Sequence, residues 1–166
     1  PQTLDKILTA AYAKRPNLRQ SLYVVTTLSP ATLSALTYDS VTTPPITTRF
    51  VSPFLGWSPK AVKTFVVQGV PDYSLLDYRI LFIADEQTVR DKSLLLVEGY
   101  NLDDWMTVRV APEYANVEAR RLSWGKRSTD MLVELADAET DGVYRGIGGE
   151  PAIEAVQETG LETGDY

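Results

Sequence analysis

Residues 78–97 read YRILFIADEQTVRDKSLLLV, and this stretch decides the fold class. The run 78–84 is rich in aliphatic and aromatic residues and predicts a strand. Asp85 follows it, and the polar residues 86–91 predict a short helix that Asp85 caps. Residues 93–97 are almost wholly apolar, which is typical of a strand buried on both faces. Two strands joined through a helix indicate an α/β protein.

The sequence on either side of this stretch predicts further helices and strands. Thr3 and Ser29 are candidate N-caps, and Pro30 fits the first position of a helix. Apolar residues recur at helical spacing near the N-terminus and alternate with polar residues over 106–110. We expect helices over 3–14, 30–36 and 128–137, strands over 21–26, 62–68 and 106–110, a turn over 101–104 and an extended segment over 142–147.

These elements predict one compact α/β domain over residues 1–147. Its core is a single mixed β-sheet of about five to six strands with flanking helices. Residues 37–60 form an irregular stretch rich in proline, threonine and aromatic side chains. Because a disordered linker rarely contains so many large apolar groups, we expect an ordered loop packed on the core, a lid over a site or an interface.

The net charge of −6 is unevenly distributed along the chain. Residues 147–166 contain five acidic and no basic residues, whereas the rest contains sixteen basic and seventeen acidic ones. We therefore expect residues 148–166 to form an acidic, flexible C-terminal tail whose removal leaves the melting temperature nearly unchanged. A nearly neutral body also argues against nucleic-acid binding, which needs a basic face.

The chain contains no histidine and no cysteine, which excludes several kinds of site. Ser-His-Asp and Cys-His catalysis, zinc fingers and disulfides are not possible without these residues. We expect no metal site and no cofactor, and any acid–base chemistry has to come from carboxylates, lysines or tyrosines. The apolar runs are too short to cross a membrane, so we expect a soluble, cytoplasmic protein without membrane contact.

Three carboxylates are candidate catalytic groups, namely Asp85, Glu98 and Glu118. Asp85 lies at the end of a predicted strand, where ligands bind in open α/β sheets. The alternative is that Asp85 only caps the following helix, and that Glu98 and Glu118 only pair with arginines. The acidic pair Asp103-Asp104 beside Trp105 similarly reads as a turn, although it could hold a cation.

Several arginines and tryptophans are candidate ligand-binding residues. Arg109 and Arg145 lie within or beside apolar segments, where they either bind a carboxylate ligand or form structural ion pairs. Arg121 and Trp124 belong to a basic run at 120–127 that suits an anionic ligand, or forms a solvated face. Trp57 lies in the aromatic part of the irregular stretch.

The C-terminal half resembles an uncharacterised family of small α/β domains known mainly from actinobacterial proteins. The resemblance rests on MTVRVAP at 106–112, Val117-Glu118, Leu122-Ser123, ELAD at 134–137 and DGVYRG at 141–146. It covers about residues 20–147 and is best after Tyr78. It differs where the family has Asn-Leu-Ser and this chain has Arg121-Leu-Ser. The resemblance implies a small α/β domain with no known reaction or cofactor.

Two functions remain open at this point. The first is a non-catalytic module that binds a protein or a small ligand, with the aromatic loop as its contact surface. The second is a cofactor-independent isomerase, cyclase or lyase that uses a carboxylate in an apolar pocket. An enclosed cavity with an unpaired acid favours the enzyme, and an open surface with every acid paired favours the binding module.

Overall fold

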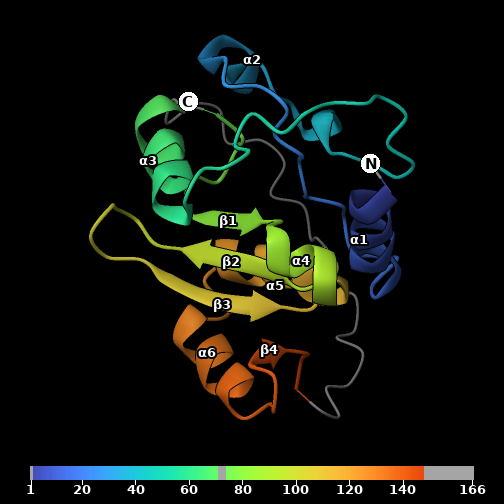
Figure 1. The fold of residues 1–166 in the computed structure, drawn as a ribbon, viewed down its shortest axis with the longest axis vertical. Coiled ribbons are helices and arrows are strands. Elements are labelled where there is room, and N and C mark those ends of the chain that lie inside the picture. Colours follow the sequence, from blue (N-terminus) through green and yellow to red (C-terminus); the bar gives the residue numbers. More distant parts are fainter. Residues whose placement is uncertain (1, 71–73, 148–166) are drawn as a thin grey trace, which may run out of the picture.

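The computed structural model describes residues 2–70 and 74–147, and a four-stranded sheet forms its centre (Figure 1). The strands lie in the order β1-β2-β3-β4 and comprise β1 (Ile80–Ile83), β2 (Leu94–Glu98), β3 (Met106–Val110) and β4 (Val143–Tyr144). The helices are α1 (Gln2–Ala13), α2 (Pro30–Ser34), α3 (Pro59–Gly69), α4 (Glu86–Asp91), α5 (Pro112–Ser123) and α6 (Thr129–Asp137), with a 3₁₀ turn, η1, at Tyr38–Ser40.

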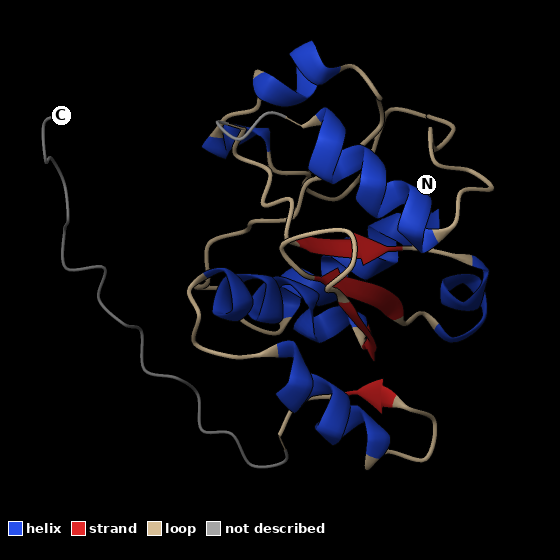
Figure 2. Cartoon of the chain, turned by 90° about the vertical axis from the view of Figure 1, so that its left-hand side faces the viewer, coloured by secondary structure: helices blue, strands red, loops and turns tan. Residues whose placement is uncertain are grey.

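The sheet is mixed, as the sequence predicts. β1, β2 and β3 pair antiparallel, whereas β4 pairs parallel to β3. One face of the sheet contributes Leu96, Val108 and Val110 to a core that also contains residues of α5 and α6. The short helix α4 lies on the opposite side of the sheet from α5 (Figures 1 and 2).

The number of strands is wrong in the sequence-based expectation, because the sheet has four strands rather than five to six. Residues 62–68 are not a strand but most of α3, which Ser58 caps by accepting a hydrogen bond from the N–H of Ala61. Val62 and Val66 are spaced by four residues and lie on the buried side of this helix. Tertiary packing of that face therefore overrides the β-propensity of its β-branched residues.

Residues 21–26 are extended but do not form a strand of the sheet. Their side chains alternate between two hydrophobic clusters, with Leu22 and Val24 packed against the cluster around α1. Tyr23 and Val25 pack against the cluster around α2 and α3. The β-forming residues that predict a strand here therefore pack on two sides without a partner strand. At the other end of the chain, only two residues of the extended stretch 142–147 pair as β4.

Helix α5 was not predicted, although its residues pack in the core against the sheet. Its buried face contains Asn116, Glu118 and Arg121 among apolar residues. These polar groups interrupt the periodic apolar pattern by which an amphipathic helix is recognised. Helices α1, α2 and α6 begin and end within two residues of their predicted bounds, and α4 matches them fully.

The N-terminal helix α1 is part of the core. Ile7, Leu8, Ala11 and Tyr12 are buried in one cluster with Leu94 of β2 and Ala115 of α5. The hydroxyl of Tyr12 donates to the carbonyl of Thr42 at 2.9 Å, and burial raises the pKa of Tyr12 to about 12. α1 thus joins the sheet region to the irregular stretch that follows it.

No helix among the described residues is long and apolar enough to cross a membrane. The acidic C-terminal tail expected at 148–166 lies outside the described residues.

Candidate functional site

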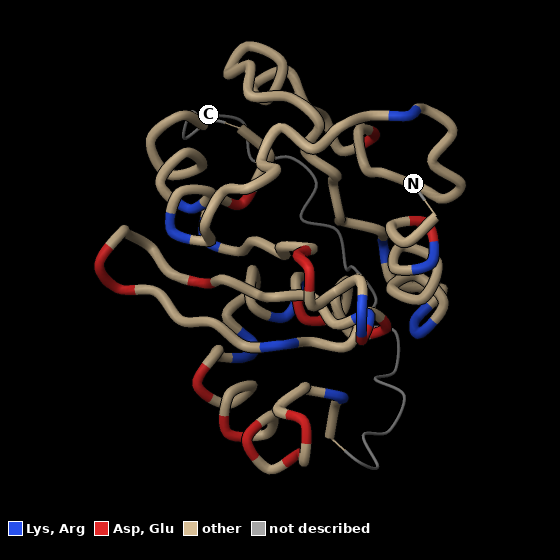
Figure 3. Tube along the Cα trace, in the orientation of Figure 1, with Lys and Arg blue, Asp and Glu red and all other residues tan. Residues whose placement is uncertain are grey.

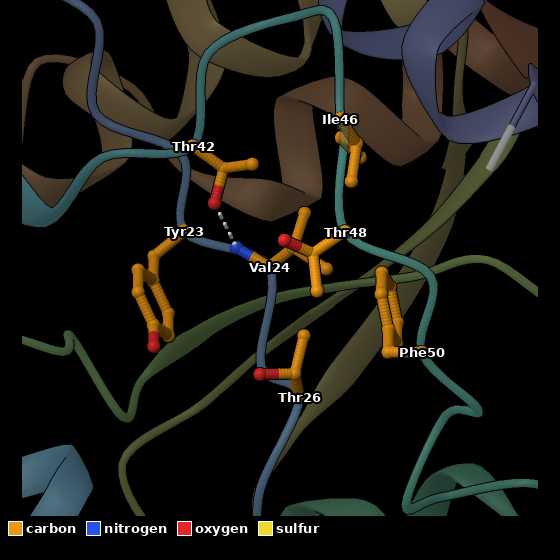
Figure 4. Close-up of a pocket in the computed structure, with 7 residues that line it drawn as sticks. All are labelled: Tyr23, Val24, Thr26, Thr42, Ile46, Thr48 and Phe50. Carbon is orange, nitrogen blue, oxygen red and sulfur yellow. Dashed lines mark hydrogen bonds between the residues drawn. The ribbon is translucent and has the colours of Figure 1, made fainter.

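A pocket of about 290 Å³ opens between two extended segments in the N-terminal half (Figure 4). One wall comes from the segment after α1 and the other from the irregular stretch 37–60. The described residues lining it are Tyr23, Val24, Thr26, Thr42, Ile46, Thr48 and Phe50. The pocket is open to solvent on one side rather than enclosed.

Side chains, rather than a ladder of main-chain bonds, hold the two walls together. The N–H of Thr42 donates to the carbonyl of Leu22, and the hydroxyl of Thr42 accepts from the N–H of Val24, both at 2.9 Å. The carboxylate of Asp5 in α1 accepts from the N–H of Ile46 at 2.5 Å. In Figure 4 the walls separate below these contacts, and the side chain of Val24 points towards Thr48.

The pocket is electrically neutral. Its described lining combines three threonine hydroxyls with the aliphatic side chains of Val24 and Ile46 and the rings of Tyr23 and Phe50. Figure 3 shows that charged residues are sparse along this part of the chain, since residues 21–58 contain only Asp39 and Arg49. Such a surface can bind apolar groups and donate or accept hydrogen bonds, but it offers no carboxylate for acid–base catalysis.

Asp85 lies away from this pocket and has two structural roles. Its side chain caps α4 by accepting from the N–H of Thr88 at 3.0 Å, which confirms the predicted cap. It also forms a bidentate ion pair with Arg109 of β3. The hydrogen bonds from Arg109 lower the pKa of Asp85 to about 2. That direction is opposite to the raised pKa that a carboxylic acid needs for proton transfer near neutral pH.

Glu118 is fully buried in a polar cluster between α5, α6 and β4. Its Oε1 accepts from Arg121 and from the hydroxyl of Tyr144, both at 2.9 Å. Arg127 donates to the same hydroxyl at 2.7 Å. Glu118 thus pairs with arginines of the basic run, and the cluster is too enclosed for a substrate to reach the carboxylate.

Lys63 is 1% exposed and lies on the buried face of α3. Its Nζ donates to the carbonyls of Gly99 at 2.6 Å and Tyr78 at 2.9 Å. Burial lowers the pKa of Lys63, while the charges of Glu98 and Asp77 oppose this shift. The lysine therefore fastens α3 to the edge of the sheet.

The other predicted site residues do not come together in one place. Glu98 is half-buried at the end of β2, where it lies opposite Met106. Arg145 forms an exposed ion pair with Asp141, as its structural interpretation predicts.

Trp124 follows α5, and Arg120 and Lys126 lie over its ring. Trp57 packs edge-to-face against Phe54 and Phe65, which fixes the end of the irregular stretch on α3.

Asp103 and Asp104 lie in an exposed turn, where their N–H groups donate to the side chain of Asn101. Across residues 2–70 and 74–147, no group of three or more acidic residues is placed to hold a metal ion. The turn interpretation of this acidic pair is therefore the one that the hydrogen bonds support.

The sequence did not identify the pocket because its walls come from segments about twenty residues apart. The aromatic loop was a candidate contact surface, and Phe50 of that loop does line the pocket. The opposite wall, however, was expected to be a strand of the sheet. The excess of threonine over charged residues at 21–58 was the signal that could have indicated a neutral binding surface.

The fold and the pocket together define a small α/β protein with an open pocket that uncharged residues line. Residues 31–147 match a family described as a domain of unknown function, DUF6924, and the chain belongs to this family. No curated protein and no solved structure matches the chain. The family match confirms the resemblance found in the sequence. Helix α1 and the pocket wall at 23–26 precede the matched region.

Proposed function

We propose that this protein is a non-catalytic binding module that holds an uncharged ligand group in the pocket between residues 23–26 and 42–50. The observation that supports this proposal is the pocket lining, in which threonine hydroxyls and apolar side chains occur without a charged residue. Binding sites for small groups typically combine an apolar surface with a few polar atoms that fix orientation.

The enzymatic alternative has less support. Asp85 and Glu118 each accept hydrogen bonds from arginine, and neither lines the pocket. Glu98 is the last residue of β2, where its charge acts on Lys63, and it does not line the pocket. A carboxylate mechanism would therefore require an acid that the described pocket does not contain.

A variant that fills the pocket tests the proposal. Thr48→Trp places an indole between the walls, and Thr107→Trp adds the same group at an exposed position of β3 as a matched control. Two probe sets are applied to each protein, namely a library of uncharged fragments observed by saturation-transfer NMR and a phage-displayed library of random octapeptides.

We expect binders that Thr48→Trp loses and Thr107→Trp retains. Melting curves of both variants establish that they are folded, and Thr26→Trp replaces Thr48→Trp if the latter is not. If neither library yields a binder that is sensitive to filling the pocket, the proposal is wrong.

A further inference from the structure

The two pocket walls contain backbone groups without a partner in the described protein. Residues 23–28 are extended, and the contacts to Thr42 use only the carbonyl of Leu22 and the N–H of Val24. The backbone N–H and carbonyl groups of residues 25–28 make no hydrogen bond to any other residue that the structure describes. Such a run of unpaired groups is rare inside proteins and is typical of a sheet edge.

The opposite wall has the same property. The N–H of Ile46 is held by Asp5, but within the described ranges the backbone groups of residues 47–51 have no hydrogen-bond partner. These residues are not helical, and the chain bends at Thr48. Two non-helical segments with unpaired backbone groups therefore border one pocket (Figure 4).

We infer that the ligand of this pocket is an extended polypeptide segment, which pairs with the unpaired backbone of residues 25–28 or 47–51 and places an uncharged side chain between Val24 and Phe50. This inference rests on the proposed binding function and specifies its ligand. Strand addition is an established mode of peptide recognition, in which main-chain hydrogen bonds give affinity and a pocket selects alternate side chains.

The chemistry of the walls determines which peptide fits. Both walls consist largely of valine, threonine and aromatic residues, which favour the extended conformation. A charged side chain entering the pocket would lose water without meeting an opposite charge, so the selected residue is apolar or bears a hydroxyl. The volume of about 290 Å³ lies at the lower end of the range for small-molecule pockets, roughly 300–1,000 Å³, and suits a side chain better than a large cofactor.

The experiment uses the full chain and the octapeptides selected from the displayed library. The strongest pocket-dependent binder is synthesised in its natural form and as two forms that are N-methylated at alternate backbone amides. Methylation removes hydrogen-bond donors and leaves the side chains unchanged. Affinities are measured by fluorescence polarisation, and amide hydrogen exchange of the protein is followed by NMR with and without peptide.

We expect one of the two methylated forms to bind about tenfold or more weakly, because only every second amide of a strand faces its partner strand. We also expect exchange to slow at alternate amides of residues 25–28 or 47–51. Equal binding of all three forms, or unchanged exchange at both walls, overturns the inference while the pocket remains a binding site.

Other outcomes separate the inference from the proposed function. If uncharged fragments bind in a manner sensitive to Thr48→Trp but no octapeptide does, the peptide inference fails and the binding function stands. If the protein instead associates with itself through the pocket, so that dimers seen by sedimentation disappear in Thr48→Trp, a separate peptide ligand is excluded. If nothing binds to the pocket, both proposals fail.

Discussion

The sheet region and the stretch 21–58 satisfy their polar groups in different ways. Around the sheet, backbone groups pair in β-ladders, and charged side chains pair with each other, as Asp85 does with Arg109. In the stretch 21–58 there are only two charged residues, and single side chains such as Thr42 hold extended backbone in place. Apolar burial differs as well, since Leu33 is the one apolar residue of 21–58 that is fully buried, whereas the strands contain several.

The difference in backbone hydrogen bonding explains why the stretch 21–58, and not the sheet, is the proposed binding surface. A backbone that is already paired cannot bind another chain, whereas an extended backbone held by a few side-chain contacts retains donors and acceptors for a ligand. The sheet region then provides rigidity, and the uncharged stretch provides the binding surface. The predictions below test the two parts of this contrast.

The largest effect is expected in the buried ion cluster of the sheet region. Glu118→Ala removes the carboxylate that accepts from Arg121 and Tyr144, and it leaves buried guanidinium charge without that acceptor. We expect a loss of about 3–5 kcal/mol in the free energy of unfolding, measured by urea denaturation. Glu134→Ala on the exposed face of α6 is the control and should change stability by less than about 0.5 kcal/mol. A similarly small change for Glu118→Ala would show that charge pairing does not stabilise the sheet region.

The next largest effect is expected in two hydrophobic clusters, one that contains Leu8 and one that contains Leu132. Leu8 of α1 and Leu132 of α6 are both buried, at 3% and 0% exposure, in different clusters. We expect Leu8→Ala and Leu132→Ala each to destabilise the protein by about 2–5 kcal/mol, because each leaves a cavity in a packed core. Fluorescence and circular dichroism should give one common unfolding transition for both variants.

Two separate transitions, with Leu8→Ala affecting only one, would contradict the proposal that residues 1–147 form a single domain. The comparison is informative because Leu8 precedes the family match at 31–147, whereas Leu132 lies within it.

The sequence predicted the sheet region well where one physical signal was enough. β1, α4 and β2 follow from an apolar run, an N-cap and a second apolar run, and the structure confirms all three. α5 was missed because Glu118 and Arg121 lie on its buried face, and their burial depends on partners in β4 and the loop before α6. Apolar periodicity within one segment cannot indicate a buried face that contains charges.

α3 was assigned to the wrong class although its N-terminal signal was present. Ser58-Pro59 repeats the pattern of Ser29-Pro30, which correctly predicted α2. The valines and Phe65 that follow favoured a strand, and only packing against Leu33 and Val70 explains the helix. Capping chemistry was the better guide here, because it depends on neighbouring residues alone.

The candidate site could be predicted only in part. Phe50 belonged to the expected contact loop, but Val24 and Thr42 of the opposite walls meet through one threonine hydroxyl. Local patterns do not indicate which of many threonines bridges two distant segments. The family match does not supply the missing residues either, since the wall at 23–26 precedes the matched range.

A smaller effect is expected for the surface ion pair of the sheet region. Asp85→Asn retains a capping side chain for α4 but loses the charge that pairs with Arg109. Because Arg109 lowers the pKa of Asp85 from 3.8 to about 2, this pair stabilises the fold fully above about pH 4 and less as the pH falls towards 2. Asp85 is 34% exposed and partly screened by water, so we expect about 1 kcal/mol at neutral pH.

Urea denaturation of wild type and Asp85→Asn between pH 5 and about pH 2.5 checks this prediction. The difference in unfolding free energy should decrease as the pH is lowered. A constant difference at all pH values would mean that lost capping, rather than the charge pair, explains the destabilisation.

The smallest effect is expected where a hydroxyl holds the two pocket walls together. Thr42→Val keeps the shape of the side chain but removes the acceptor of the Val24 N–H. Thr48→Val is the control, because it removes a pocket hydroxyl that makes no hydrogen bond to another described residue. Water can replace the lost bond at this half-buried position, so we expect Thr42→Val to destabilise by about 0.5–1 kcal/mol and Thr48→Val by less. Amide exchange gives the sharper measurement, because the Val24 N–H should exchange faster in Thr42→Val than in Thr48→Val. Equal exchange rates in the two variants would show that apolar packing holds the walls. The sheet region and the stretch 21–58 would then differ in their number of charged residues, and not in how their backbone groups are hydrogen-bonded.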